Sequence, residues 1–475
     1  MSEETIVTHW THSGTTASPD TAHWQRRLTE IAIRQRIPGA VLAIAHGDNL
    51  IEVAHGVLNV ATGVPTTTDS LFQIGSITKV WTATAVMRLV DQGTLDLDVP
   101  LIDLFPELAQ GDSAILDRVT MRHLLTHTSG IDGDVFTDTG RGDDCLRRYV
   151  AELAGVGRIH PIDATWSYCN SGFTLAGRVI ELITGTTWDT AMRELLFEPL
   201  GLRHTVTLPE EALLHRAAVG HLAGPDGTPR RADRWYLPRS SGPAGAIAAT
   251  ARDVLTFAGL HLNDGVGPDG ERLLSSESVR RMAQEQLAVP FMGEMVDSWG
   301  IGWWRGDWHG ARMIGHNGGT IGQTAQLQIL PEQRLTIVVL TNGSAAQSAF
   351  TELSTEIAAE LAGVRTPEPF APPSEPPSFD PARYVGCYER SGVRHEIRLD
   401  DTELVLKTTF SGELAEVAPV PSVEQRLTPV ATDLFAARST FDQDVWQRVT
   451  FHTIADGTRY LHLGGRAAEY VASEA

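Results

Sequence analysis

A proline-rich segment near residue 370 constrains the fold of this chain more than any other feature of the sequence. Residues 366–381 read TPEPFAPPSEPPSFDP. Proline fixes an extended backbone, and it can neither continue a helix nor pair in the centre of a sheet. We therefore expect a linker at 366–381 that separates a large unit at 1–365 from a small unit at 382–475.

Hydrophobic patterns near both ends of the large unit predict how it is built. Each end carries a pair of alternating runs typical of a β-hairpin, next to a run with helical periodicity. The sequence between the hairpins is mostly typical of helices and loops. We therefore predict an α/β (α+β) fold in which one antiparallel sheet takes strands from both ends and is flanked by helices, with a helical insertion as the other wall of a cleft. The strands are expected at 40–46, 50–58, 324–330 and 335–342, and the helices at 21–36 and 345–362.

The small unit has a different pattern. Its sequence consists of short alternating runs separated by turn residues, which is typical of antiparallel strands. We predict a separate antiparallel β-barrel or sandwich for 382–475. The runs lie at 384–390, 395–399, 403–407, 434–438, 446–451 and 460–463.

Composition narrows the range of partners. The chain is 42% hydrophobic, as globular proteins are, and it has a formal net charge of −21 without any Lys/Arg run. Because phosphate binding needs a positive patch, no nucleic-acid partner is expected. No apolar window is long enough to cross a bilayer, and residues 1–20 lack the basic-then-apolar pattern of a signal peptide. We therefore expect no membrane partner and a cytoplasmic location.

No motif predicts a metal ion or a cofactor. Cys145, Cys169 and Cys387 are far apart and lack Cys-x-x-Cys spacing. His123 and His127 have a spacing that zinc can use, but no His-Glu-x-x-His pattern or third ligand accompanies them.

The first chemical signal is Gly75-Ser76-Ile77-Thr78-Lys79, which opens an apolar helical run. Positions i and i+3 share a helix face, so the hydroxyl of Ser76 and the amine of Lys79 can meet. Unpaired N–H groups at a helix start favour a developing oxyanion. A buried lysine loses affinity for its proton, so Lys79 could act as a general base or keep a neighbouring base active. Ser-x-x-Lys is common by chance, and alone it equally fits a helix cap beside a solvated lysine.

The second signal is a Tyr-x-Asn motif at Tyr168 and Asn170. A phenol at this position could pass the proton of the serine to the leaving group, and the amide could orient the lysine and the substrate. Alone, Tyr168 equally fits a core residue.

The third signal is the stretch His316-Asn317-Gly318-Gly319, just before the second hairpin. Its glycines let a substrate lie close along a strand edge, with a polar side chain facing the serine. A single histidine is more often structural than catalytic, so this motif gains meaning only beside the other two.

In combination, the three motifs resemble the serine β-lactamase superfamily. The match is closest to the branch that contains class C β-lactamases, DD-carboxypeptidases, D-aminopeptidases and family VIII-type esterases. The resemblance covers roughly 21–364 and implies a β-lactamase/transpeptidase-like sheet with flanking helices. Further hallmarks of this branch lie at 121–130 (MRHLLTHTSG), 242–245 (GPAG) and 250–253 (TARD).

The resemblance also implies roles for individual residues. Ser76 would be the nucleophile that forms an acyl-enzyme, and Lys79 and Tyr168 would transfer protons. Asn170 would belong to the supporting network, and the backbone N–H groups of Ser76 and Gly319 would form the oxyanion hole. Whether Lys79 or Tyr168 is the base in acylation stays open, because their protonation is coupled.

One motif departs from the family pattern. Many penicillin-hydrolysing relatives have Lys-Thr-Gly where this chain has His316-Asn317-Gly318. A fixed ammonium suits the β-lactam carboxylate better than a histidine, which is mostly neutral at pH 7. Esterases and D-peptide enzymes of the branch often have histidine there, so the sequence argues against an antibiotic-resistance enzyme.

The small unit resembles the lipocalin-like domain of D-aminopeptidases and of penicillin-binding-protein-type thioesterases, which release and cyclise nonribosomal peptides. Arg466, near its end, could reach the catalytic cleft and pair with a substrate carboxylate, or it could be a solvated surface arginine. Trp235 with Tyr236, and Trp303 with Trp304, could wall the acyl site or simply pack.

We therefore expect a cofactor-independent serine hydrolase that acts on small-molecule or peptide substrates, namely esters, amides or peptides, including those with D-residues. An acyltransferase or thioesterase is the neighbouring alternative, in which an amine or alcohol resolves the acyl-enzyme and the substrate is bound to a peptidyl carrier as a thioester. A catalytically silent peptide- or β-lactam-binding protein is an alternative of another class, which the retained motifs disfavour.

Overall fold

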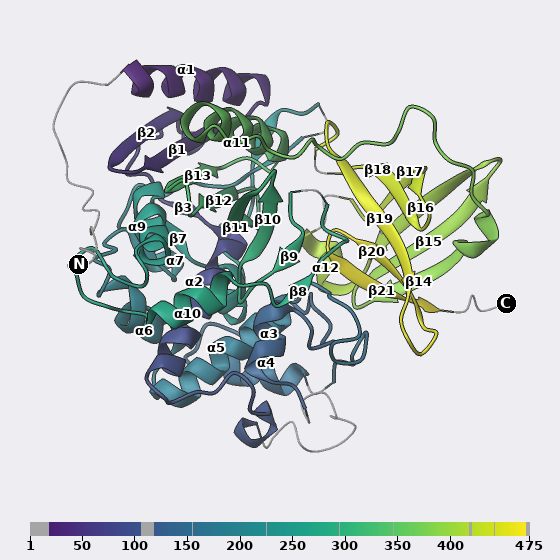
Figure 1. Cartoon of the computed structure of the whole chain (residues 1–475), viewed down its shortest axis with the longest axis horizontal. Helices are drawn as coiled ribbons and strands as arrows, with labels where there is room; N and C mark the ends of the chain where they lie inside the picture. Colours follow the sequence, from purple (N-terminus) through teal and green to yellow (C-terminus); the bar gives the residue numbers. More distant parts are fainter. Residues whose placement is uncertain are drawn as a thin grey trace.

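An eight-stranded antiparallel sheet forms the centre of the larger part of the molecule (Figure 1). The computed structural model describes residues 19–471 except 106–117, 154, 225, 294, 345, 418–419 and 441. Most of the polar N-terminal segment and Ala345, the first residue of the second predicted helix, lie outside the described residues. The strands follow the order β2 (Asn49–Gly56), β1 (Gly39–His46), β13 (Leu335–Thr341), β12 (Thr324–Leu330), β11 (Ala311–Gly319), β10 (Trp304–Trp308), β9 (Ser298–Trp299) and β8 (Leu287–Ala288).

The two predicted hairpins meet in this sheet, which confirms that it is assembled from both ends of the large unit. Strand β1 pairs with β13, with Ala40 opposite Thr341 and His46 opposite Leu335. Strands β8 to β11 were not predicted, because the sequence between the hairpins was expected to be helices and loops. Strands β8 and β9 have two residues each, and glycines interrupt the apolar pattern of β11.

Helices cover both faces of the sheet. Helices α1 (Pro19–Arg34) and α11 (Gln347–Ala362) pack together on one face, as predicted for the two ends, and α9 (Ala251–Leu262) packs on the other. Helix α2 (Thr78–Asp91) lies inside the molecule. It is buried along almost its whole length, which accounts for its lack of a polar face.

The segment between the hairpins contains the predicted helical insertion. The helices are α3 (Met121–Thr126), α4 (Cys145–Leu153), α5 (Asn170–Thr184), α6 (Trp188–Met192), α7 (Pro209–Ala212), α8 (Gly242–Gly245) and α10 (Ser276–Ala283). Helices α5, α8 and α10 of this segment contact α2, and α3, α4 and α5 lie below the sheet in the view of Figure 1. Short strands are β3 (Phe72–Gln73), β4 (Thr205–Val206), β5 (His221–Ala223), β6 (Pro229–Arg231) and β7 (Ala248–Ala249).

The C-terminal part is a closed antiparallel barrel, as predicted. Residues 366–380 carry neither helix nor strand and connect α11 to it. The sequence patterns did not predict β17, which contains Pro429 and two charged residues, or β21, which is short. The barrel contains β14 (Gly386–Arg390), β15 (Val393–Asp400), β16 (Glu403–Phe410), α12 (Gly412–Val417), β17 (Ser422–Ala431), β18 (Leu434–Arg438), β19 (Trp446–Thr453), β20 (Arg459–Leu463) and β21 (Arg466–Val471).

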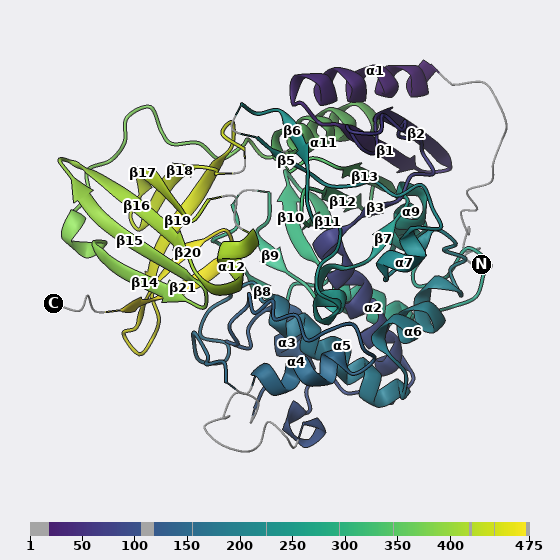
Figure 2. The same cartoon turned by 180° about the vertical axis from the view of Figure 1, so that it is seen from behind.

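The barrel lies against the β8–β10 side of the sheet in both views (Figures 1 and 2). Tyr460 donates a 2.8 Å hydrogen bond to the carbonyl of Ile159, and Ser348 of α11 donates one of 2.8 Å to Asp442 in the β18–β19 loop. These bonds join the barrel to the insertion at one point and to α11 at another. Across the described ranges, no helix combines the length and apolar character needed to span a bilayer.

Candidate active site

Ser76 and Lys79 meet at the start of helix α2. The Nζ of Lys79 lies 3.0 Å from the Oγ of Ser76 and donates a 2.7 Å hydrogen bond to the carbonyl of Ala244 in α8. Lys79 is fully buried, whereas Ser76 remains partly exposed. Burial, with a further contribution from the cationic Arg466, holds the pKa of Lys79 well below its usual range. A neutral amine at this position can accept a proton from the serine.

The backbone before α2 is shaped by close packing against β11. Gly75 has a φ of +52°, and a Cβ there would lie 2.5 Å from the backbone N of Gly319. A Cβ on Gly318 would lie 1.8 Å from the carbonyl oxygen of Ile74 and 3.0 Å from the N of Ser76. Only glycine fits these positions, and their approach places the end of β11 directly against the serine.

Tyr168 lies beside the lysine, just before helix α5. The Nζ of Lys79 is 4.9 Å from the ring centroid of Tyr168. Burial raises the pKa of the phenol, and a hydrogen bond with Ser76 and the charge of Arg466 oppose that rise. At neutral pH the phenol is therefore protonated and can donate a proton to a leaving group.

His127 supports the tyrosine, a role that the sequence did not show. Helix α3 ends at His127, whose Nδ1 accepts a 2.9 Å hydrogen bond from the N–H of Cys169. Its ring centroid lies 4.4 Å from that of Tyr168. Burial keeps the pKa of His127 well below its usual range, so a neutral imidazole fixes the backbone next to the phenol.

The side chains of the HNGG stretch lie in strand β11. His316 is 3% exposed and stacks on Trp304, with centroids 5.5 Å apart. Burial lowers the pKa of His316 to about 3, so the imidazole is neutral at pH 7. In the part of the chain that the structure describes, its Nε2 and the Oδ1 of Asn317 are buried and have no hydrogen-bond partner.

Asn170 and Arg466 meet on a carboxylate that the sequence did not single out, Asp134. Asn170 donates a 2.7 Å hydrogen bond to Asp134, and its role in orienting Lys79 and the substrate stays a prediction. Arg466 binds Asp134 through two nitrogens, at 2.6 and 3.2 Å, and its Cζ lies 5.0 Å from the ring centroid of Tyr168. Arg466 is thus at the cleft, and the alternative of a solvated surface arginine is wrong.

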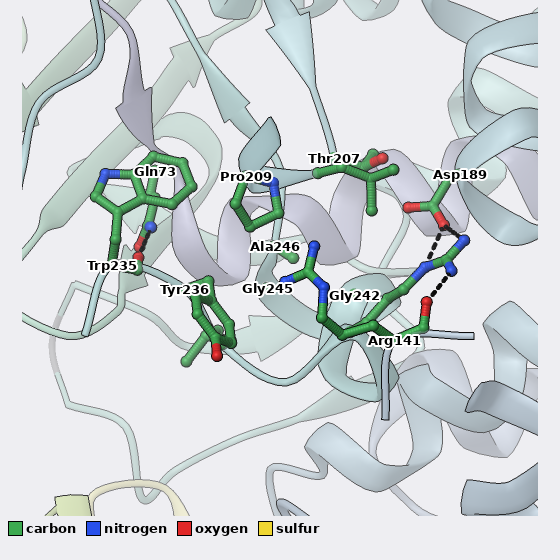
Figure 3. A pocket seen from close by; sticks show the side chains of 13 residues that line it. Gln73, Arg141, Asp189, Thr207, Pro209, Trp235, Tyr236, Gly242, Gly245 and Ala246 are labelled. Atoms are coloured by element: carbon green, nitrogen blue, oxygen red, sulfur yellow. Dashed lines mark hydrogen bonds and ion pairs between the residues drawn. The ribbon is translucent and has the colours of Figure 1, made fainter. Parts of the chain in front are cut away.

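A hollow is lined by residues of several loops (Figure 3), and Ser76 is not among its lining residues. Trp235 and Tyr236 line it, together with Gln73. Gly245 joins it to the site, since a Cβ there would lie 3.8 Å from the carbonyl carbon of Gly75. The indole of Trp235 is fixed by a 2.6 Å hydrogen bond to the carbonyl of Ala218.

The charged residues that line the hollow form ion pairs. Arg239 binds Asp189 at 2.9 Å, and Arg141 binds Glu210 at 2.5 Å. The proposed aromatic wall is only partly right, because Trp303 is fully buried in the main core. Nowhere in the described ranges do three His, Cys, Asp or Glu side chains group closely enough to hold a metal ion.

Comparison with known proteins identifies the family. The model of the Beta-lactamase family matches residues 24–362. The chain belongs to the Beta-lactamase family. Penicillin-binding protein 4 of Amycolatopsis lactamdurans is 48% identical to it over 375 residues, which are 78% of this chain and 98% of the relative.

Other Beta-lactamase relatives include esterase EstB of Burkholderia gladioli, 31% identical over 58% of this chain and 73% of the esterase. The crystal structure of SurE with D-Leu has 27% sequence identity and a TM-score of 0.74, covering 95% of this chain and 99% of SurE. The barrel is therefore shared with a solved relative. The chain is a serine hydrolase of the Beta-lactamase family.

Proposed function

We propose that Ser76 is the nucleophile of an acyl-enzyme mechanism. The contact between the partly exposed hydroxyl of Ser76 and the fully buried amine of Lys79 carries this proposal. The Oγ of Ser76 attacks the substrate carbonyl carbon as its proton passes to Lys79, directly or through Tyr168. The backbone N–H groups of Ser76 and Gly319 face the oxyanion.

Collapse of the tetrahedral intermediate breaks the bond to the leaving group. Tyr168 gives a proton to the departing atom, and Lys79 resupplies the phenol. Water then attacks the acyl carbonyl, loses its proton to the same pair and releases the acid and Ser76.

We propose esters and amides of uncharged amino acids, D-residues included, as the substrate class. The paired charges of the hollow and the neutral His316 support uncharged groups near the acyl carbon. The similarity to an esterase and to SurE, whose structure holds D-Leu, supports this choice. Penicillin hydrolysis is not part of the proposal, because no fixed ammonium stands in the place of His316.

When the leaving group of such an amide is itself an amino acid, Arg466 is the proposed site for the free carboxylate of that leaving group. A guanidinium carries five N–H donors, and Arg466 uses three of them on Asp134 and the carbonyl of Gly464. Two donors remain without a partner among the described residues, which suffices for one carboxylate.

Acyl transfer to an amine or alcohol, including release of a carrier-bound thioester, is a second candidate. The turn between barrel strands β20 and β21 favours acyl transfer. Gly465 in this turn packs on Trp166, and its carbonyl accepts a 2.9 Å hydrogen bond from the N–H of Tyr168. The β20–β21 turn would therefore narrow the path by which water reaches an acyl group on Ser76.

Hydrolysis of p-nitrophenyl esters of N-acetylated D- and L-leucine and D-glutamate tests the proposal. We expect turnover of the leucine esters, faster for the D-form, and little turnover of the glutamate ester. Equal rates for all three would contradict the proposed substrate class. The same reactions are repeated with glycine amide present as an amine acceptor. Formation of the N-acyl glycine amide in place of the free acid would support the second candidate, acyl transfer.

A further inference from the structure

The carboxylate of Asp134 joins barrel and insertion next to the candidate catalytic residues. It is 4% exposed and has four close contacts, two with Arg466, one with Asn170 and one with Arg390 at 2.9 Å. Asn170 begins helix α5 of the insertion, whereas Arg390 and Arg466 lie on barrel strands β14 and β21. A single side chain therefore ties three segments together.

The backbone around Asp134 also contacts Tyr168. A Cβ on Gly133 would lie 2.4 Å from the carbonyl oxygen of Tyr168, and the carbonyl of Gly133 accepts a 2.8 Å hydrogen bond from the N–H of Asn170. Two hydrogen bonds cross from the insertion to the barrel at this point. The N–H of Tyr168 donates to the carbonyl of Gly465, and the Oγ of Ser167 accepts a 3.1 Å hydrogen bond from the N–H of Ala467. Tyr168 is thus held between the Asp134 loop and the β20–β21 turn.

We propose that Asp134 is a positioning residue through which the barrel completes the catalytic site. Its carboxylate anchors Arg466 beside the ring of Tyr168, and Arg390 and Asn170 hold the carboxylate in place. The inference rests on the proposed acylation of Ser76, in which Tyr168 moves a proton.

The charges of Asp134, Arg390 and Arg466 explain why the position of Arg466 matters for Tyr168. Two arginines and one carboxylate leave one net positive charge beside Tyr168 and Lys79. Burial alone would raise the pKa of Asp134, but Arg466 and Arg390 hold it well below its usual range. The carboxylate is therefore ionised at working pH, and Arg466 has a permanent partner on the side away from the substrate.

A double-mutant cycle on the rate at which Ser76 is phosphonylated, taken as the measure of its acylation rate, tests the proposal. The full-length wild type, D134N, R466M and the double variant are mixed with a fluorophosphonate, and the adduct is followed by intact mass, with thermal unfolding as a measure of folded protein. A displacement near 1 Å costs on the order of 100-fold in rate, so each single variant should acylate 10- to 100-fold more slowly. Because Asp134 acts through Arg466, the double variant should be no slower than the slower single variant.

D442N is the matched control. Asp442 is also buried and also joins the barrel to the rest of the chain, but through Ser348 on α11. We expect its acylation rate to stay within twofold of the wild type. R390M, which removes another partner of the same carboxylate, should slow acylation about tenfold, and it serves as the test if D134N does not fold.

Several results would overturn the inference. Multiplicative losses in the double variant, equal rates for D134N and D442N, or an unchanged rate for R390M would each mean that Asp134 does not act by anchoring Arg466. Absence of an adduct on the wild type would overturn the proposed function itself, which is a different and separately visible outcome.

Discussion

The guanidinium carbon of Arg466 lies 5.0 Å from the ring centroid of Tyr168, and the amine of Lys79 lies 4.9 Å from the same centroid. One cation comes from the barrel and the other from the central helix α2. The phenol is thus adjacent to two positive charges, or to one when Lys79 is neutral. This arrangement makes the protonation of Lys79 and Tyr168 depend on both parts of the chain.

Lys79 is one of only two lysines in the chain, the other being Lys407 on β16. We predict that K79M lowers kcat/KM for ester hydrolysis by about 10²- to 10⁴-fold, because the proton acceptor is lost. K407M should leave kcat/KM unchanged. An unchanged value for K79M would contradict the role of Lys79.

The same substitution should affect stability in a pH-dependent way. Because burial lowers the pKa of Lys79, the folded chain loses this proton at a lower pH than the unfolded chain does, and the stability of the wild type rises with pH toward 10.5. The Tm of K79M relative to the wild type should therefore be higher at pH 6 than at pH 9. Thermal unfolding monitored by circular dichroism at the two pH values checks this, and a difference that grows with pH would refute it.

His316 should contribute to acid unfolding. Its pKa is about 3 in the folded chain against 6.5 for the ordinary group, so the unfolded chain binds the extra proton as the pH falls from 6.5 to 3. The resulting loss of stability is about 1.4 kcal/mol per pH unit over that window. Urea unfolding of H316N at pH 7 and pH 5 should show a smaller loss than the wild type. H309N, which changes an exposed histidine between β10 and β11, should behave like the wild type.

Neighbouring glycines of β11 give a matched pair. G318A places a Cβ 1.8 Å from the carbonyl oxygen of Ile74, whereas a Cβ on Gly319 meets nothing within 4 Å. We predict that G318A lowers Tm and reduces kcat by about 100-fold, since the strand must move away from Ser76. G319A should keep the wild-type Tm. Equal Tm values for the two variants would show that the close packing of β11 on residues 74–76 is not required.

The sequence predicted those features that depend on local pattern. Period-2 and helical runs predicted the terminal hairpins and the flanking helices, and the spacing of Ser76 and Lys79 predicted their contact on α2. The end of β11 lies against Ser76, as its motif suggested, although the sequence did not predict that these residues form an interior strand.

Features that arise only from the tertiary fold could not be predicted. Asp134 follows the recognisable stretch 121–130 by four positions, but nothing in its local sequence shows that two arginines from the barrel converge on it. His127 was set aside as structural, and only the fold places its ring against Tyr168. The sequence left open whether Arg466 reaches the cleft or is a surface arginine, and its bond to Asp134 depends on how the barrel packs.

The intact mass of the wild type and of S76A after exposure to a fluorophosphonate tests the central claim most directly. We predict one added phosphonyl group on the wild type and none on S76A, with Ser76 as the labelled residue after peptide mapping. An unmodified wild type, or an equal adduct on S76A, would contradict it.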